Sequence, residues 1–248
     1  MESVKTWGGF EFFKKLVPLV REFVFPSNCP LCEGSILNSE DALRGLCSRC
    51  ADIFKLDRGH ENGMCCEKCG KPLISERNTC LRCRERSENL LYDSMIVLYP
   101  YTGMFLELLH SYKFGKHRSL RVFFAQKLLE GIEMLKTDES FVLVPVPPRS
   151  GKIKSSGWDQ IESIAEILQK HRPLERCLKR LPSKSQKTLN RSERYENLKG
   201  KIICTTKVPD NIILFDDVFT TGATMNVCAG VLKEAGAKNV SGICLFYD

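Results

Sequence analysis

Residues 212–224 read IILFDDVFTTGAT: four apolar residues, two adjacent aspartates, and then small hydroxylic residues around a glycine. A short continuous apolar run is typical of a parallel strand that is covered on both faces. Residues 225–234 have a helical composition that ends near Gly236, and residues 240–246 form a second apolar run. The sequence therefore predicts a strand, loop, helix and strand unit of a doubly wound α/β domain.

The aspartates, Asp216 and Asp217, stand where ligands bind in such folds, beyond the carboxyl ends of the strands. The residues after them suit a phosphate, because amides at a helix N-terminus, threonine hydroxyls and a glycine can surround an anion. A Walker loop is excluded because no lysine follows the glycine, and the chain contains no GxGxxG. A ribose 5-phosphate fits both features, and the plain alternative is that the aspartates only cap the next turn.

Thirteen cysteines are many for 248 residues, and nine of them lie in residues 29–83. Eight form four CxxC pairs: Cys29 with Cys32, Cys47 with Cys50, Cys66 with Cys69, and Cys80 with Cys83. Two CxxC turns close a tetrahedral shell of four thiolates, so the pairs predict two structural zinc ions. Sequential and interleaved sharing of the pairs both remain open, and Cys65 is either a bystander or a replacement for Cys66.

We expect an amphipathic segment over residues 1–28, a double zinc-ribbon module over residues 29–90 and an α/β domain over residues 91–248. The module is too poor in apolar residues to fold without metal. Gly34 and Gly70 are expected to turn the backbone so that amides approach the sulfurs. No apolar window is long enough to span a membrane, and the absence of a secretory signal favours the cytoplasm.

The net charge of +7 is unevenly distributed. Residues 29–90 carry ten basic and ten acidic residues, and thiolates around zinc make that module negative, which disfavours a phosphate-tracking surface. Residues 170–201 carry eleven basic and three acidic residues. Because Tyr195 is the single aromatic residue there, this segment suits a polyphosphate better than stacked bases.

Together, the apolar run, Asp-Asp and Thr-Thr-Gly-Ala-Thr resemble the phosphoribosyl pyrophosphate (PRPP) signature of type I phosphoribosyltransferases. The resemblance implies that Asp216 and Asp217 are catalytic and hold the ribose hydroxyls. It implies a 5′-phosphate site at Thr220, Thr221, Gly222, Ala223 and Thr224. Carboxylates beside the ribose stabilise the positive charge that develops as pyrophosphate leaves. Mg²⁺ is expected on the diphosphate.

The same resemblance assigns the turn after residues 141–148 to pyrophosphate, because prolines and cations suit a rigid anion-binding turn. Its candidates are Arg149, Lys152 and Lys154. The basic segment is expected to form a flexible loop that closes over the ligand. Its candidates are Gln186, Arg191 and Arg194.

The order of these pieces resembles the ComF family of competence proteins over residues 29–248. The shared features are the cysteine module, Tyr112-Lys113-Phe114, the Val-Pro-Val-Pro strand, and the stretch from Gln186 to Gly200 before the signature. This resemblance implies either a PRPP-dependent transferase or an accessory of DNA uptake with little turnover. The accessory would bind single-stranded DNA or a helicase partner.

The chain departs from the family pattern at one place. The family carries Arg-Gly-Phe-Asn-Gln after the proline strand, whereas this chain reads Ser156-Gly157-Trp158-Asp159-Gln160. The arginine is absent and an acid replaces the amide. Pyrophosphate binding is therefore expected to be weaker, unless Lys154 substitutes for the arginine with a less well oriented charge.

Overall fold

The structure is a computed structural model and describes residues 28–55, 65–85, 89–115, 117–135, 140–149, 157–182 and 198–248. The expected amphipathic segment lies outside the described residues, except for Asn28. Within the described ranges, no helix is both long and apolar enough to cross a membrane.

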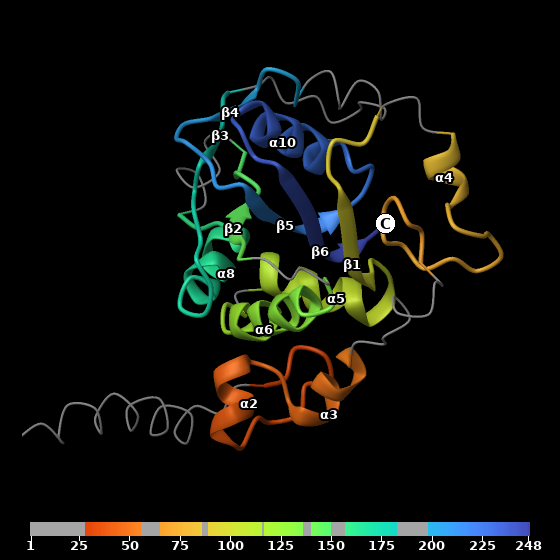
Figure 1. The fold of residues 1–248 in the computed structure, drawn as a ribbon. Coiled ribbons are helices and arrows are strands. Elements are labelled where there is room, and N and C mark those ends of the chain that lie inside the picture. Colours follow the sequence, from red (N-terminus) through yellow and green to blue (C-terminus); the bar gives the residue numbers. More distant parts are fainter. Residues whose placement is uncertain are drawn as a thin grey trace, which may run out of the picture.

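Four parallel strands form the central sheet, in the spatial order β1-β6-β5-β2 (Figure 1). They are β1 (Ser94–Pro100), β6 (Asn239–Tyr247), β5 (Asn211–Phe219) and β2 (Val142–Pro145). Leu214 in the middle of β5 pairs with Val144 on one side and with Gly242 on the other. Parallel strands need crossover connections. The sheet therefore confirms the predicted α/β class with a mainly parallel sheet.

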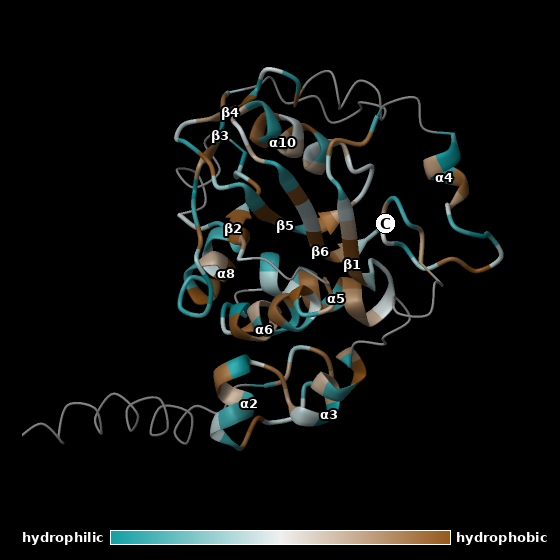
Figure 2. Ribbon diagram, in the orientation of Figure 1, coloured by the Kyte–Doolittle hydropathy of each residue, from teal (hydrophilic) through white to brown (hydrophobic). Residues whose placement is uncertain are grey.

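Helices cover both faces of this sheet (Figure 1). One face carries α10 (Ala223–Glu234), and the other carries α5 (Gly103–Lys113), α6 (Leu120–Ile132) and α8 (Gln160–Leu168). Successive β5 side chains alternate between two hydrophobic cores: Leu214 packs with α10, and Phe215 packs with α5, α6 and α8. Figure 2 shows the apolar residues along the strands and their flanking helices. This double burial explains the uninterrupted apolar run.

A small antiparallel hairpin lies next to the sheet. It consists of β3 (Leu178–Arg180) and β4 (Ile202–Cys204), with Arg180 opposite Ile202. β4 packs against α10, so the hairpin is fixed to the face that carries this helix. The two strands flank the middle of the basic segment, residues 183–197, which lies outside the described residues.

The cysteine-rich part forms two ribbons that pack on different parts of the molecule (Figure 1). The first ribbon (residues 28–55) contains α2 (Ser39–Arg44), α3 (Ser48–Ala51) and the 3₁₀ helix η1 (Asp52–Phe54), and it lies below α6. The second ribbon (residues 65–85) contains α4 (Leu81–Arg84) and lies beside β1. Phe54 anchors the first ribbon, because its fully buried ring meets the rings of Tyr99 and Phe123 edge-on, at 5.3 and 5.4 Å.

Candidate functional site

The first ribbon brings four thiols together as a metal-binding shell. The Sγ atoms of Cys29, Cys32, Cys47 and Cys50 all lie within 4.8 Å of one another, and those of Cys32 and Cys47 are 3.7 Å apart. Zn–S bonds of about 2.3 Å in a tetrahedron separate the sulfurs by about 3.8 Å. The four thiols therefore fit one zinc ion, which would join the two turns of this ribbon.

The second ribbon repeats the arrangement. It gathers Cys66, Cys69, Cys80 and Cys83, all buried, with 3.7 Å between the sulfurs of Cys69 and Cys80. The amide of Cys80 donates a hydrogen bond of 3.3 Å to Cys66 Sγ, as expected around a metal-bound thiolate. The pairs are thus shared sequentially, which the spacing left open. Cys65 lies outside the shell.

The backbone turns beside these thiols follow the prediction in part. Gly70 has a φ of +70°, the left-handed region that glycine adopts readily. In the turn after Cys32 the left-handed residue is Glu33, with a φ of +57°, rather than Gly34. The amide of Gly34 nevertheless reaches Cys32 and, together with Arg49, lowers the pKa of this thiol to about 6.

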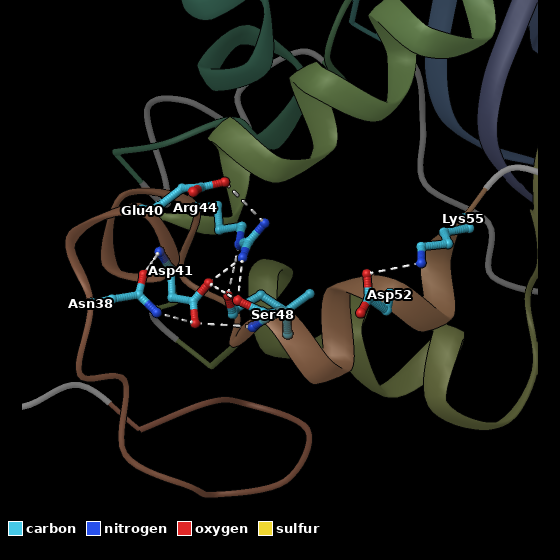
Figure 3. Close-up of polar contacts among 8 residues, drawn as sticks. Asn38, Glu40, Asp41, Arg44, Ser48, Asp52 and Lys55 are labelled. Carbon is cyan, nitrogen blue, oxygen red and sulfur yellow. Dashed lines mark hydrogen bonds and ion pairs between the residues drawn. The ribbon is translucent and has the colours of Figure 1, made fainter.

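A buried carboxylate holds the first ribbon's metal-binding turn in place (Figure 3). Asp41 in α2 accepts hydrogen bonds from the amide and hydroxyl of Ser48, at 3.0 and 2.8 Å, and it pairs with Arg44. Burial opposes its ionisation, but hydrogen bonds from Arg44, Ser48 and Asn38 lower its pKa to about 2. Because Ser48 follows Cys47, this network fixes the start of α3.

The two aspartates lie inside β5 rather than after it. Pairing with β6 continues from Asp216 opposite Cys244 to Phe219 opposite Tyr247. The expected strand end at Phe215 is therefore wrong by four residues, because β6 supplies ladder partners beyond the apolar run. The aspartates still stand near the carboxyl end of a strand in the middle of the sheet, where ligands of such folds bind.

Asp217 is held by two side chains from the face of the sheet that carries α5 and α8. Its Oδ2 accepts a hydrogen bond of 2.7 Å from Gln160 Nε2 and forms an ion pair of 2.8 Å with Lys113 Nζ. The hydroxyl of Tyr112, one residue before the lysine, donates a hydrogen bond of 2.8 Å to the backbone carbonyl of Gln160. The end of α5 and the start of α8 thus fix one carboxylate. In the sequence, Lys113 and Gln160 are marked only by their places in the ComF pattern.

Asp216 has a different environment. It is half-buried, and its Oδ1 accepts a hydrogen bond of 2.8 Å from the backbone amide of Asp217. Burial and, after it, the negative charge of Asp217 raise the pKa of Asp216 to about 8. The pair therefore combines one carboxylate with a fixed cation and a second whose charge depends on pH in the neutral range.

The predicted phosphate loop connects β5 to α10. Gly222 has a φ of +76° and caps the helix, which begins at Ala223 rather than at Met225. The amide of Ala223 lies 3.3 Å from Thr221 Oγ1. Thr220, Thr221, Gly222, Ala223 and Thr224 therefore form one turn at a helix N-terminus, where amides and the helix dipole favour an anion.

Two arginines approach the same end of the sheet. Arg149 is exposed beyond β2. The pKa of Arg180 is lowered first by its own burial and next by the positive charge of Arg149, whereas the negative charge of Asp216 raises it. In the sequence, Arg180 is one of many cations of the basic segment, and its place at the end of β3 brings it near Arg149 and Asp216. The other predicted ligand-binding residues lie outside the described residues: Lys152, Lys154, Gln186, Arg191 and Arg194.

The departure from the family pattern has a structural explanation at one residue. Asp159 is 5% exposed and caps α8. Its Oδ1 accepts hydrogen bonds from the amides of Ile161, at 2.9 Å, and Glu162, at 3.0 Å. Aspartate and asparagine are equally good caps, so the acid keeps the amide's role. Beside it, Trp158 lines a cavity of about 480 Å³ between α6 and α8, and neither Asp216 nor Asp217 lines this cavity.

Comparisons with known proteins agree with these features. The double zinc ribbon domain family matches residues 20–84. The chain is 32% identical to the competence protein ComFC of Bacillus subtilis (strain 168), over 81% of this chain and 83% of that protein. It is 30% identical to the competence protein ComFC of Streptococcus pneumoniae, over 85% and 90%. It is 24% identical to the competence protein F of Haemophilus influenzae, over 87% and 95%.

These matches span most of each protein, and the two paired-cysteine shells and the parallel sheet occur in the order that the family pattern requires. On this evidence, the chain belongs to the ComF family.

Proposed function

We propose that this protein binds PRPP and transfers its phosphoribosyl group to an acceptor with release of pyrophosphate. The observation that carries the proposal is the pair Asp216 and Asp217 near the carboxyl end of β5, followed at once by a turn at the N-terminus of α10. The pair would accept hydrogen bonds from the ribose hydroxyls, and residues 220–224 would bind the 5′-phosphate. Arg149 and Arg180 would attract the pyrophosphate group, which carries Mg²⁺ in solution.

The chemistry of the proposed reaction suits these charges. A bond forms between the acceptor and C1 of the ribose as the bond from C1 to the pyrophosphate oxygen breaks, and the electron pair leaves with pyrophosphate. The ribose ring carries positive charge in the transition state, so carboxylates beside it stabilise the transition state more than the neutral ground state. Lys113 and Gln160 would hold Asp217 in its orientation before the ligand binds.

Calorimetric titration of PRPP with Mg²⁺ into the zinc-loaded protein tests the proposal. We expect a dissociation constant in the micromolar range, which Asp216→Asn combined with Asp217→Asn raises at least about a hundredfold. Asp210→Asn is the matched control, because it removes a carboxylate that pairs with Lys238 at the opposite end of β5. Equal affinity in the wild type and the double variant would overturn the assignment.

A role in DNA uptake is the second proposal, because the relatives are named competence proteins. The basic residues of segment 170–201 would then contact a DNA backbone. Binding of single-stranded oligonucleotides measured from 50 to 200 mM salt tests this role, since contacts with phosphates give affinities that fall steeply with salt. Salt-independent or undetectable binding would leave only a protein partner as the link to DNA uptake.

A further inference from the structure

The second ribbon packs directly on the sheet beneath its metal-binding shell. A Cβ added to Gly70 would lie 2.3 Å from the backbone oxygen of Met95 in β1, so glycine is required for this close approach. The ribbon's four cysteines belong to the same hydrophobic core as Met95 and the residues of α10. The cysteines of the first ribbon that enter a core pack instead with α5 and α6. The second ribbon is thus the one attached to the half of the molecule that carries the phosphate loop.

Arg82 links this ribbon to the loop itself. It lies in α4, between the thiols of Cys80 and Cys83, and its Nη1 donates to the carbonyl oxygens of Thr220, at 3.2 Å, and Asp248, at 2.9 Å. Thr220 is the first residue of the phosphate loop. The amide of Asp248 in turn donates a hydrogen bond of 3.0 Å to the carbonyl of Phe219. A single guanidinium therefore binds the chain where both β5 and β6 end.

We propose that Arg82 is a positioning residue for the phosphate loop, held by the second ribbon's metal-binding turn. This inference rests on the proposed function. The peptide between Thr220 and Thr221 is planar and trans, so a carbonyl directed at Arg82 leaves the amide of Thr221 directed away from it. By binding the carbonyl, Arg82 fixes the direction of an amide assigned to the 5′-phosphate. A charged donor makes this bond stronger than a neutral one.

The two metal sites would then differ in function. The buried residues of the first ribbon pack with α5 and α6 on the other face of the sheet, and α2 contacts α6, so this ribbon would stabilise that face. The second ribbon would set how well the loop is ordered before the ligand arrives. Preorganisation of this kind raises affinity by removing the entropy cost of ordering the loop on binding.

Arg82→Ala tests the inference, with Arg84→Ala as the matched control on the same helix. Titrations of ribose 5-phosphate and of inorganic pyrophosphate are compared on zinc-loaded proteins. We expect Arg82→Ala to weaken ribose 5-phosphate binding about tenfold, the contribution of one hydrogen bond with a charged partner. Pyrophosphate binding should be unchanged, and Arg84→Ala should change neither. Amide hydrogen exchange should become faster at residues 220–224 in Arg82→Ala alone.

Zinc content shows whether the ribbon is intact. If Arg82→Ala binds fewer than two zinc ions, Arg82→Met replaces it, because methionine keeps the apolar stem without a donor. Wild-type affinity for ribose 5-phosphate together with unchanged exchange in a zinc-loaded variant would overturn the inference and leave the proposed function standing. A wild-type protein that binds neither PRPP nor ribose 5-phosphate would overturn the proposed function, and the role of Arg82 with it.

Discussion

Lys113 and Asp217 form an ion pair of 2.8 Å that joins the last residue of α5 to β5 near its carboxyl end. Their side chains are only 18% and 10% exposed, so water screens the pair less than it screens a surface pair. Lys113 also opposes the burial that raises the pKa of Asp216. One lysine thus acts on both carboxylates.

Lys113→Met is therefore expected to weaken PRPP binding about tenfold or more, because removing one partner leaves a buried carboxylate without its cation. Lys113→Arg should restore most of the affinity. Lys179→Met, at an exposed position in β3, is the control for lost charge. Calorimetry at constant pH measures the three variants, and unchanged affinity in Lys113→Met would show that Gln160 alone is sufficient to orient Asp217.

The raised pKa of Asp216 predicts how stability depends on pH. Its pKa is about 8 in the folded protein against an ordinary 3.8, so between these values the folded state retains a proton that the unfolded state has lost. Stability from this group is therefore present at low pH and is lost as pH rises toward and through 8. Asp216→Asn should remove this loss and be the more stable protein at pH 8.

Urea unfolding of the zinc-loaded wild type and Asp216→Asn at several values from pH 5 to pH 9 measures this difference. Comparison at each pH cancels the pH dependence of zinc binding, which the two proteins share. A difference in unfolding free energy that does not change with pH would contradict the assignment of the proton to Asp216.

Zinc content distinguishes two adjacent cysteines. Cys66 belongs to the second shell and Cys65 does not, so Cys66→Ser should bind about one zinc ion per chain tightly, while Cys65→Ser should bind two. Elemental analysis after gel filtration measures both. Loss of one ion in Cys65→Ser, with two retained in Cys66→Ser, would mean that Cys65 is the ligand.

The cap at Asp159 predicts a graded effect on stability. Asp159→Ala should lower the free energy of unfolding by about 1 kcal/mol, because the amides of Ile161 and Glu162 lose their acceptor. Asp159→Asn should change it little. Denaturant unfolding compares the two. Equal destabilisation by both substitutions would indicate that the negative charge, rather than the cap, is what the site requires.

Local pattern predicted most of the fold. The apolar run of β5 and the threonine-glycine turn each determine their own structure through neighbours in the chain, so a strand, a loop and a helix follow one another in the predicted order. The length of the strand was not predictable from local pattern, because it depends on a partner strand. β5 continues to Phe219 because β6 provides backbone partners up to that residue. Identical CxxC spacing carried no information about which turns share an ion, and the folded arrangement of the ribbons decided it.

Residues that reach the site from a distance were the ones missed. Lys113, Gln160 and Arg82 come from three separate elements, and no periodicity marks a side chain that will contact Asp217 or Thr220. Tyr112 and Lys113 belong to the family pattern, but the pattern does not show what they contact. The packing of α5 against β5 brings Lys113 to Asp217 and Tyr112 to the carbonyl of Gln160. The boundary at residue 90 stays a prediction, and Phe54, which packs against Tyr99, is the residue through which to test it.

Gly70 lies against Met95, and Met95 belongs to β1, the outermost strand on its side of the sheet. A strand in that position offers unpaired backbone groups to other chains unless something covers it. The second ribbon lies beside that strand (Figure 1). A chain without zinc in the second ribbon would therefore expose a template for intermolecular strand pairing, and we expect metal depletion to lead to aggregation.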